Sequence, residues 1–443
     1  MESKRNTSSS PGVLATSAAI GCGLAALLIS STEIAAARQI DHGPKLPPGA
    51  WSRIKAIDIA PLPGAPANGA FLDGNGDGIH TRTYRVYRSA RCDPAKSGGV
   101  PCPLVIALHP ANHTGFGFVN GDAYRGMSWT EAADIYRLVV AAPNAEFENN
   151  GFPSWSNGLF MGEQRIATVD EVGFLSQMVA KIAADGFAHI APDTDGVWLH
   201  GGSAGGFLVH SLAGVFNSQF AYRIRGIATS VATYGGHTES PFYNDPDVAE
   251  HNVEDRTLCF QSVWKKPFDL LNPLPAYPIP ALVMMGKYDV KVPDEGGSNN
   301  GCFGVKEDRY IPAGCRADRA LRYTRDLDEN AQHYAGALGE ALPPGFDSDC
   351  SGQPVIEEDS ALKRVVTYGR DAAGVPYGGF DSAGRPSRCK AVVRSVLHSC
   401  GTLDCPTQER WIHHSFPATT AQVQVWNTAQ RIVSFWREFA GLP

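Results

Sequence analysis

The segment that most constrains the fold is VWLHGGSAGG, residues 197–206, where an apolar run ends in glycines around one serine. Such a run is typical of a buried strand. After the glycines, apolar residues recur at helical spacing: Phe207, Leu208, Leu212 and Val215. Residues 201–205 fit the pattern G-x-S-x-G, in which small neighbours permit a sharp turn that exposes a serine above a parallel sheet. The segment therefore predicts an α/β fold with Ser203 at that turn.

Two interpretations of Ser203 follow. A short motif of glycine and serine also arises by chance, and a tight turn between strand and helix needs small residues whatever the serine does. The strand before and the helix after, over residues 204–216, are the context that a nucleophile requires. Because the positive end of that helix points toward the serine, it also favours an oxyanion there. We therefore predict that Ser203 is the nucleophile.

The rest of the chain alternates between strands and helices. Buried or alternating runs predict strands at 81–88, 103–108, 137–143, 224–231, 280–286 and 363–368, and helical spacing predicts helices at 129–136, 170–184 and 420–439. This alternation predicts a mostly parallel central sheet with helices on both faces. The apolar content of 43% and charged content of 19% suit a globular domain of this size.

The N-terminus has the pattern of a signal peptide. Lys4 and Arg5 precede an apolar stretch over 13–29 and three alanines at 35–37, which predicts cleavage after residue 37 and a secreted or periplasmic protein. An uncleaved membrane anchor is the alternative, because the stretch is nearly long enough to span a bilayer.

Residues 38–70, rich in proline and glycine, predict an extended lead-in, and residues 71–443 a single catalytic domain. Within it, Asp73 to Asp77 match half of a calcium loop, but Tyr84 stands where the closing acid belongs. A tight hairpin turn explains the same residues, so we predict no metal site.

The chain has ten cysteines, and removal of Cys22 with the signal peptide leaves nine, which favours an oxidising compartment. None has the spacing of a zinc site. Short polar loops predict three local disulfides. These pairs are Cys92 with Cys102, Cys302 with Cys315, and Cys400 with Cys405. The pairing of the other cysteines stays open, and Cys259 is the candidate for the odd, free thiol among the nine.

A serine nucleophile needs a base and a group that orients the base. Asp289 follows the strand at 280–286, and His414 lies downstream, so that the order is serine, acid, histidine. Asp289 could also serve only to cap a turn. His413, next to His414 in the chain, satisfies the same order of serine, acid and histidine.

Together, residues 193–206, residues 289–293 with the glycines at 296–297, and residues 414–417 resemble the secreted esterase family that includes poly(3-hydroxybutyrate) depolymerases and feruloyl or acetylxylan esterases. The resemblance covers most of residues 80–440 and implies an α/β-hydrolase that cleaves carboxylic esters without a cofactor. The family motif His-x-Trp-Pro selects His414 over His413, although Phe416 replaces the tryptophan.

The resemblance also implies the oxyanion hole. Where the family has His-Gly, this chain has His109 and Pro110, and proline has no N–H to donate. The N–H groups of Ala111 and Ala204 are therefore the predicted donors. We assign His109 and Trp155 to the substrate pocket, although a structural tryptophan explains Trp155 as well.

These observations predict a secreted serine esterase that acts on a small or polymeric ester. A net charge of −7 without a cluster of Lys and Arg argues against nucleic acid as a partner. One alternative is a serine peptidase of the prolyl-oligopeptidase kind, and another is a non-catalytic binding protein on a hydrolase scaffold. Part of a cysteine-rich insertion at 294–405, which carries one further strand, is predicted to border the cleft and to govern substrate choice; a surface elaboration that only adds stability is the alternative.

Overall fold

A computed structural model describes parts of the predicted catalytic domain and some of the residues before it. They are residues 49–60, 80–98, 100–120, 129–147, 153–155, 170–186, 196–213, 217, 219–232, 279–286, 355–360, 363–389, 391–398 and 428–443. Several predictions fall on other residues and lie outside this part: the signal peptide, the calcium motif, Asp289, His414, Cys259 and two of the three disulfides. No helix among the described residues is long and apolar enough to cross a membrane.

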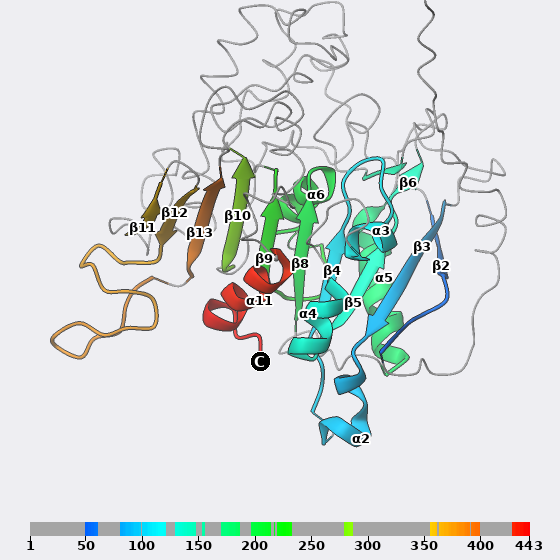
Figure 1. Ribbon diagram of the computed structural model, residues 1–443, viewed down its shortest axis with the longest axis horizontal. Coiled ribbons are helices and arrows are strands. Elements are labelled where there is room, and N and C mark those ends of the chain that lie inside the picture. Colours follow the sequence, from blue (N-terminus) through cyan, green and yellow to red (C-terminus); the bar gives the residue numbers. More distant parts are fainter. Residues whose placement is uncertain are drawn as a thin grey trace, which may run out of the picture.

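An eleven-stranded sheet forms the centre of the molecule (Figure 1). Its order is β1-β3-β5-β4-β8-β9-β10-β13-β12-β11, and β2 pairs with β3. The strands are β1 (Ala50–Trp51), β2 (Lys55–Ile59), β3 (His80–Arg88), β4 (Leu104–Leu108), β5 (Val139–Pro143), β8 (Val197–Gly202), β9 (Ile224–Ser230), β10 (Ala281–Gly286), β11 (Val355–Asp359), β12 (Lys363–Tyr368) and β13 (Val393–His398). The run from β5 to β13 is parallel throughout, and the strands outside it pair antiparallel. The predicted mostly parallel sheet is thus confirmed.

Helices cover both faces of this sheet (Figure 1). The described helices are η1 (Ala90–Cys92), α2 (Pro94–Ser97), α3 (Gly115–Asn120), α4 (Trp129–Tyr136), α5 (Glu171–Ala184), α6 (Ala204–Ala213) and α11 (Thr428–Phe439). Side chains of α5 and α6, such as Phe174 and Leu208, belong to one hydrophobic core. Side chains of α3, α4 and α11, such as Phe118, Trp129 and Trp436, belong to the other. The two cores lie on opposite faces, because side chains alternate along each strand.

The predicted segments agree closely with the observed elements. The helix expected at 170–184 begins at Glu171, because the Asp170 carboxylate accepts the N–H of Gly173 at 2.7 Å as an N-cap. The strand expected at 363–368 has those bounds as β12. Of the C-terminal helix expected at 420–439, the structure describes 428–439 as α11.

The insertion contains more of the sheet than the sequence predicts. Instead of one strand, the described part of residues 294–405 supplies β11, β12 and β13, and β13 pairs in parallel with β10. Arg394 and Ser395 interrupt the apolar run of β13, so this buried strand lacks the usual signal. The lead-in likewise supplies β1 and β2, which pair with β3.

At one end of the sheet order, β11 is an exposed edge strand with the sequence VIEED. Its register against β12 shifts between Ile356 and Glu358, which is a β-bulge at Glu357. The Glu357 carboxylate lies 2.9 Å from an Arg394 guanidinium nitrogen of β13, and Glu358 forms an ion pair with Lys363. These side chains join the edge to the inner strands.

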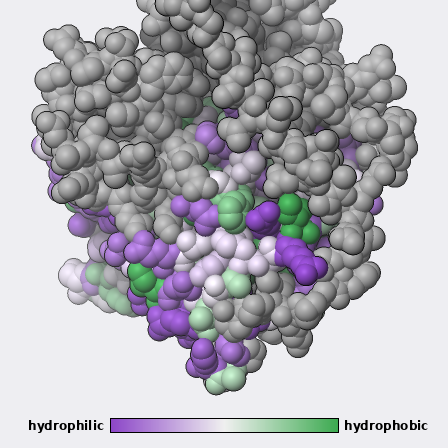
Figure 2. Space-filling model, turned by 45° about the vertical axis from the view of Figure 1, so that its right-hand side comes forward, coloured by the Kyte–Doolittle hydropathy of each residue, from purple (hydrophilic) through white to green (hydrophobic). Residues whose placement is uncertain are grey.

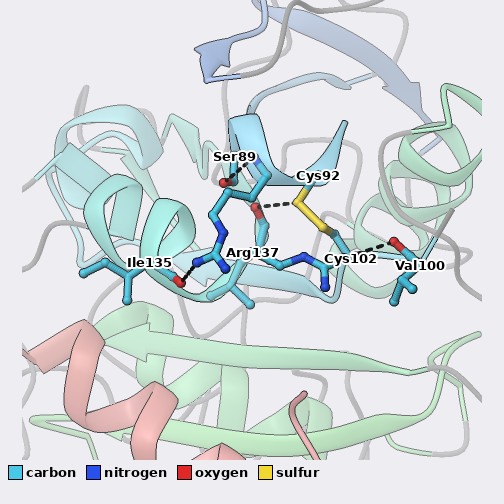
Figure 3. The surroundings of a disulfide bond; sticks show 8 residues. Ser89, Cys92, Val100, Cys102, Ile135 and Arg137 are labelled. Atoms are coloured by element: carbon cyan, nitrogen blue, oxygen red, sulfur yellow. Dashed lines mark hydrogen bonds between the residues drawn. A yellow bond between two sulfur atoms is a disulfide. The ribbon is translucent and has the colours of Figure 1, made fainter. Parts of the chain in front are cut away.

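The predicted disulfide between Cys92 and Cys102 is present, with its Cα atoms 5.8 Å apart. Figure 3 shows it beside the guanidinium of Arg137, which donates to the Val100 carbonyl at 3.3 Å. Both cysteines are buried, so the bond crosslinks the loop between β3 and β4 on its inner side.

Figure 2 shows mostly hydrophilic and near-neutral residues on the visible described surface, with hydrophobic residues in small separate patches.

Candidate active site

Ser203 lies between the last residue of β8 and the first residue of α6. Its φ angle is +46°, a left-handed conformation that is costly for a residue with a side chain and occurs at functional turns. Its N–H donates to the Ser230 carbonyl at 2.8 Å, and its own carbonyl accepts the N–H of Phe207 at 2.9 Å. The predicted turn from strand to helix around this serine is confirmed, and its backbone is strained.

Two glycines of the motif permit this turn. A Cβ atom on Gly201 would lie 2.2 Å from the Gly205 carbonyl oxygen, and one on Gly205 would lie 2.2 Å from that of Leu108. Both distances are far shorter than any real contact of a side-chain carbon. The start of α6 therefore packs against the backbone at the carboxyl ends of β8 and β4.

The proposed oxyanion segment follows β4 directly. β4 pairs in parallel with β8, with Leu108 opposite Gly201, and the backbone of His109 also approaches Gly205. Residues 109–111 thus leave the sheet beside the start of α6. Ala111 is partly buried against the core. The pairing of the Ala111 and Ala204 N–H groups around one oxygen stays a prediction.

His109 and Trp155 are both fully buried and form one unit. His109 Nε2 accepts the N–H of Ala145 at 2.9 Å, so Nδ1 carries the proton and donates to the Pro110 carbonyl at 2.6 Å. Burial lowers the pKa of His109 to about 3, which keeps the ring neutral. Trp155 Nε1 donates to the His109 carbonyl at 2.7 Å. These contacts hold the segment after β4 in place, and contact with a substrate stays a prediction for both residues.

An ion pair lies behind this unit. The Arg82 guanidinium of β3 is 2.8 Å from the Glu171 carboxylate at the start of α5, and both side chains are buried. The guanidinium also lies over the Phe174 ring at 4.3 Å and the Trp155 ring at 5.7 Å. The Arg82 guanidinium is thus neutralised by Glu171 and packs on two aromatic rings, and it contacts Trp155 from the interior of the protein.

On the opposite face of β8, His200 occupies a site that the sequence reading missed. Its Nδ1 accepts the indole N–H of Trp129 at 3.0 Å, and its Nε2 lies 3.2 Å from the Ser230 hydroxyl. The ring is fully buried and stacks on Phe118 with centroids 5.3 Å apart. A histidine inside an otherwise apolar strand is the signal that marks it in the sequence.

Asp289 and His414 lie outside the described residues, so their distances to Ser203 are not part of this structure. The strand that precedes Asp289, β10, ends at Gly286 and is parallel to β9, which in turn is parallel to β8. The carboxyl ends of all three strands lie at the same edge of the sheet. No cluster of three or more His, Cys, Asp or Glu side chains among the described residues has the arrangement of a metal site.

No protein-family profile matches this chain, and no curated protein matches it. Several solved structures are distantly similar. A carboxylesterase from Bacillus cereus is 12% identical, with 47% of this chain and 72% of that chain covered and a TM-score of 0.27. EstE1, a thermophilic carboxylesterase from a metagenomic library, is 15% identical, with coverages of 54% and 71% and a TM-score of 0.30. An S-formylglutathione hydrolase from Agrobacterium tumefaciens is 16% identical, with coverages of 47% and 71% and a TM-score of 0.30.

The described topology is α/β-hydrolase-like, as the sequence predicts. The parallel strands from β5 to β13, the helices on both faces and the serine at the turn after β8 have the arrangement of that class.

Proposed function

We propose that this protein is a secreted serine esterase that hydrolyses carboxylic esters. The observation that carries the proposal is the backbone of Ser203, which has a φ of +46° between a buried strand and a helix. Strain of this kind needs support from its surroundings and is concentrated at functional sites. Glycine would have no such cost at this turn, so a serine in this conformation supports a role for its hydroxyl.

The proposed reaction divides ester hydrolysis into two steps. Ser203 Oγ attacks the ester carbonyl while His414 accepts its proton, and the N–H groups of Ala111 and Ala204 stabilise the negative oxygen. The C–O bond to the alcohol then breaks, and His414 returns the proton to the departing alcohol. In the second step His414 takes a proton from water while the water oxygen attacks the acyl carbon, the bond from that carbon to Ser203 Oγ breaks, and His414 returns the proton to Oγ. Asp289 orients the imidazole and stabilises its charged form.

Three features support the location and the kind of substrate. The N-terminal pattern and the disulfide between Cys92 and Cys102 favour an exported protein. The resemblance of the motifs to depolymerases and feruloyl or acetylxylan esterases favours esters of hydroxyalkanoate polymers or of substituted sugars. Water and the ester are sufficient for the chemistry, so the proposal includes no cofactor.

The test is turnover of p-nitrophenyl esters of increasing length, methyl ferulate, acetylated xylan and a polyhydroxybutyrate film. We expect Ser203→Ala and His414→Ala each to lose about 10⁴-fold or more in kcat, and Asp289→Asn to lose about 10²-fold or more. A fluorophosphonate should label Ser203. The matched control is Ser211→Ala, which removes a buried hydroxyl from the same helix.

Near-normal ester turnover by Ser203→Ala would contradict the proposal. A peptide substrate cleaved faster than every ester would favour the peptidase instead. Folded protein that neither turns over an ester nor reacts with the fluorophosphonate would favour a binding protein on this scaffold.

A further inference from the structure

The backbone of Ser203 depends on the neighbouring strand. Its N–H donates to the carbonyl of Ser230, the last residue of β9, at 2.8 Å. A serine at a φ of +46° persists only where surrounding contacts hold it. The position of the β9 end therefore contributes to where the serine oxygen points.

The side chain of Ser230 is held in turn by β8. His200 Nδ1 accepts the indole N–H of Trp129 at 3.0 Å, so the ring proton is on Nε2. Nε2 then donates to the Ser230 hydroxyl oxygen at 3.2 Å. All three residues are at most 1% exposed, so water does not replace a lost partner readily.

The His200 ring has no freedom to act as a base. Both of its nitrogens have partners, and the ring lies between Phe118, at 5.3 Å and an interplanar angle of 20°, and Trp129, at 5.5 Å. Burial lowers the pKa of His200 to about 3, so the ring stays neutral at the pH of ester hydrolysis. Its contribution is one of orientation.

We infer that Trp129, His200 and Ser230 form a positioning relay that holds the Ser203 backbone in its strained conformation. The inference rests on the proposed function of Ser203 as the nucleophile. The relay runs from α4 through β8 to the end of β9 and reaches the nucleophile by a backbone hydrogen bond. Loss of the Ser230 hydroxyl leaves a buried N–H of His200 without its acceptor, and the end of β9 shifts as that group finds a new partner.

The main experiment compares Ser230→Ala, Ser230→Thr and the control Ser395→Ala. Ser395 is also a buried serine on a central strand, but its hydroxyl bonds to the Val366 carbonyl, away from Ser203. We expect Ser230→Ala to lower kcat and the fluorophosphonate labelling rate about tenfold with KM changed less than twofold, because small misplacements of a nucleophile are costly. Ser230→Thr keeps the hydroxyl and should restore most of the rate.

Amide hydrogen exchange is a second readout that does not need activity. In Ser230→Ala, the Ser203 amide should exchange about tenfold faster, while Ser395→Ala leaves it unchanged. If Ser230→Ala does not fold, Trp129→Phe serves instead, because it removes the indole N–H that His200 accepts and keeps an aromatic ring at this buried position. It should lower kcat about threefold and also speed exchange at Ser203.

Unchanged kcat and unchanged Ser203 exchange in Ser230→Ala or Trp129→Phe would overturn the relay. An equal loss of kcat in Ser395→Ala would also overturn it, because the effect would then follow stability alone. Failure of the proposed function has a different signature, namely ester turnover that survives Ser203→Ala.

Discussion

Replacement of Gly205 by alanine should damage both the fold and the proposed site. The added Cβ would lie 2.2 Å from the Leu108 carbonyl oxygen, whereas ordinary contact begins at 3.4 Å. The two atoms must therefore separate by about 1.2 Å. The obstacle is the backbone of a central strand, so α6 has to move away from β4. Overpacking of a core costs about 1–3 kcal/mol, and we expect a free energy of unfolding at least about 3 kcal/mol lower.

The same displacement reaches the proposed nucleophile, because Ser203 is two residues from Gly205. A misplacement of about 1 Å can cost about 10²-fold in rate, and we expect a loss of that order in kcat/KM for p-nitrophenyl acetate. The control is Gly202→Ala, whose Cβ would meet side-chain atoms of Phe118 and Pro110 as its nearest neighbours, at 3.2–3.3 Å. It should cost less than about 1.5 kcal/mol. Urea unfolding measures both variants, and a Gly205→Ala protein as stable and as active as Gly202→Ala would refute this reasoning.

Two further predictions concern stability. Replacing Cys92 and Cys102 by alanine should lower the free energy of unfolding by about 3 kcal/mol, because the bond closes a loop with a sequence separation of 10. A difference below about 1 kcal/mol in urea unfolding would contradict this. Burial lowers the pKa of His109 and His200 from 6.5 to about 3, so their stabilisation is complete above pH 6.5 and falls as the pH drops toward 3. The loss is up to about 1.4 kcal/mol per pH unit for each histidine, and equal urea midpoints at pH 6.5 and about pH 4.5 would argue against it.

The parallel sheet was predictable because its central strands are buried on both faces. Runs such as 104–108 and 281–286 therefore contain almost only apolar residues, which sequence patterns detect. β13 was not predicted, because it contains the charged residue Arg394. In the structure the Arg394 guanidinium packs beside Phe439, 5.2 Å from the centre of its ring. A charge that packs on an aromatic ring looks like a loop residue in the sequence.

The candidate site was predictable only in part, for a related reason. The turn around Ser203 is specified by residues 201–206, which are adjacent in the chain. The partners of His200 are 71 and 30 positions away, so no local pattern relates them. The burial of Trp155 likewise depends on Arg82 and His109, which come from other elements.

The outer edge at β11 affects how copies of the protein behave toward each other. An exposed edge strand has unpaired N–H and C=O groups along one side and can template pairing with a second chain. Here the bulge at Glu357 breaks the regular spacing of these groups, and Glu357, Glu358 and Asp359 follow one another along the strand. Two such edges that approach meet an interrupted ladder and a strand of acidic residues, two of which are held by Arg394 and Lys363 of the inner strands. Among the described residues, the strand that ends the sheet is thus built in a way that disfavours its extension by a second chain.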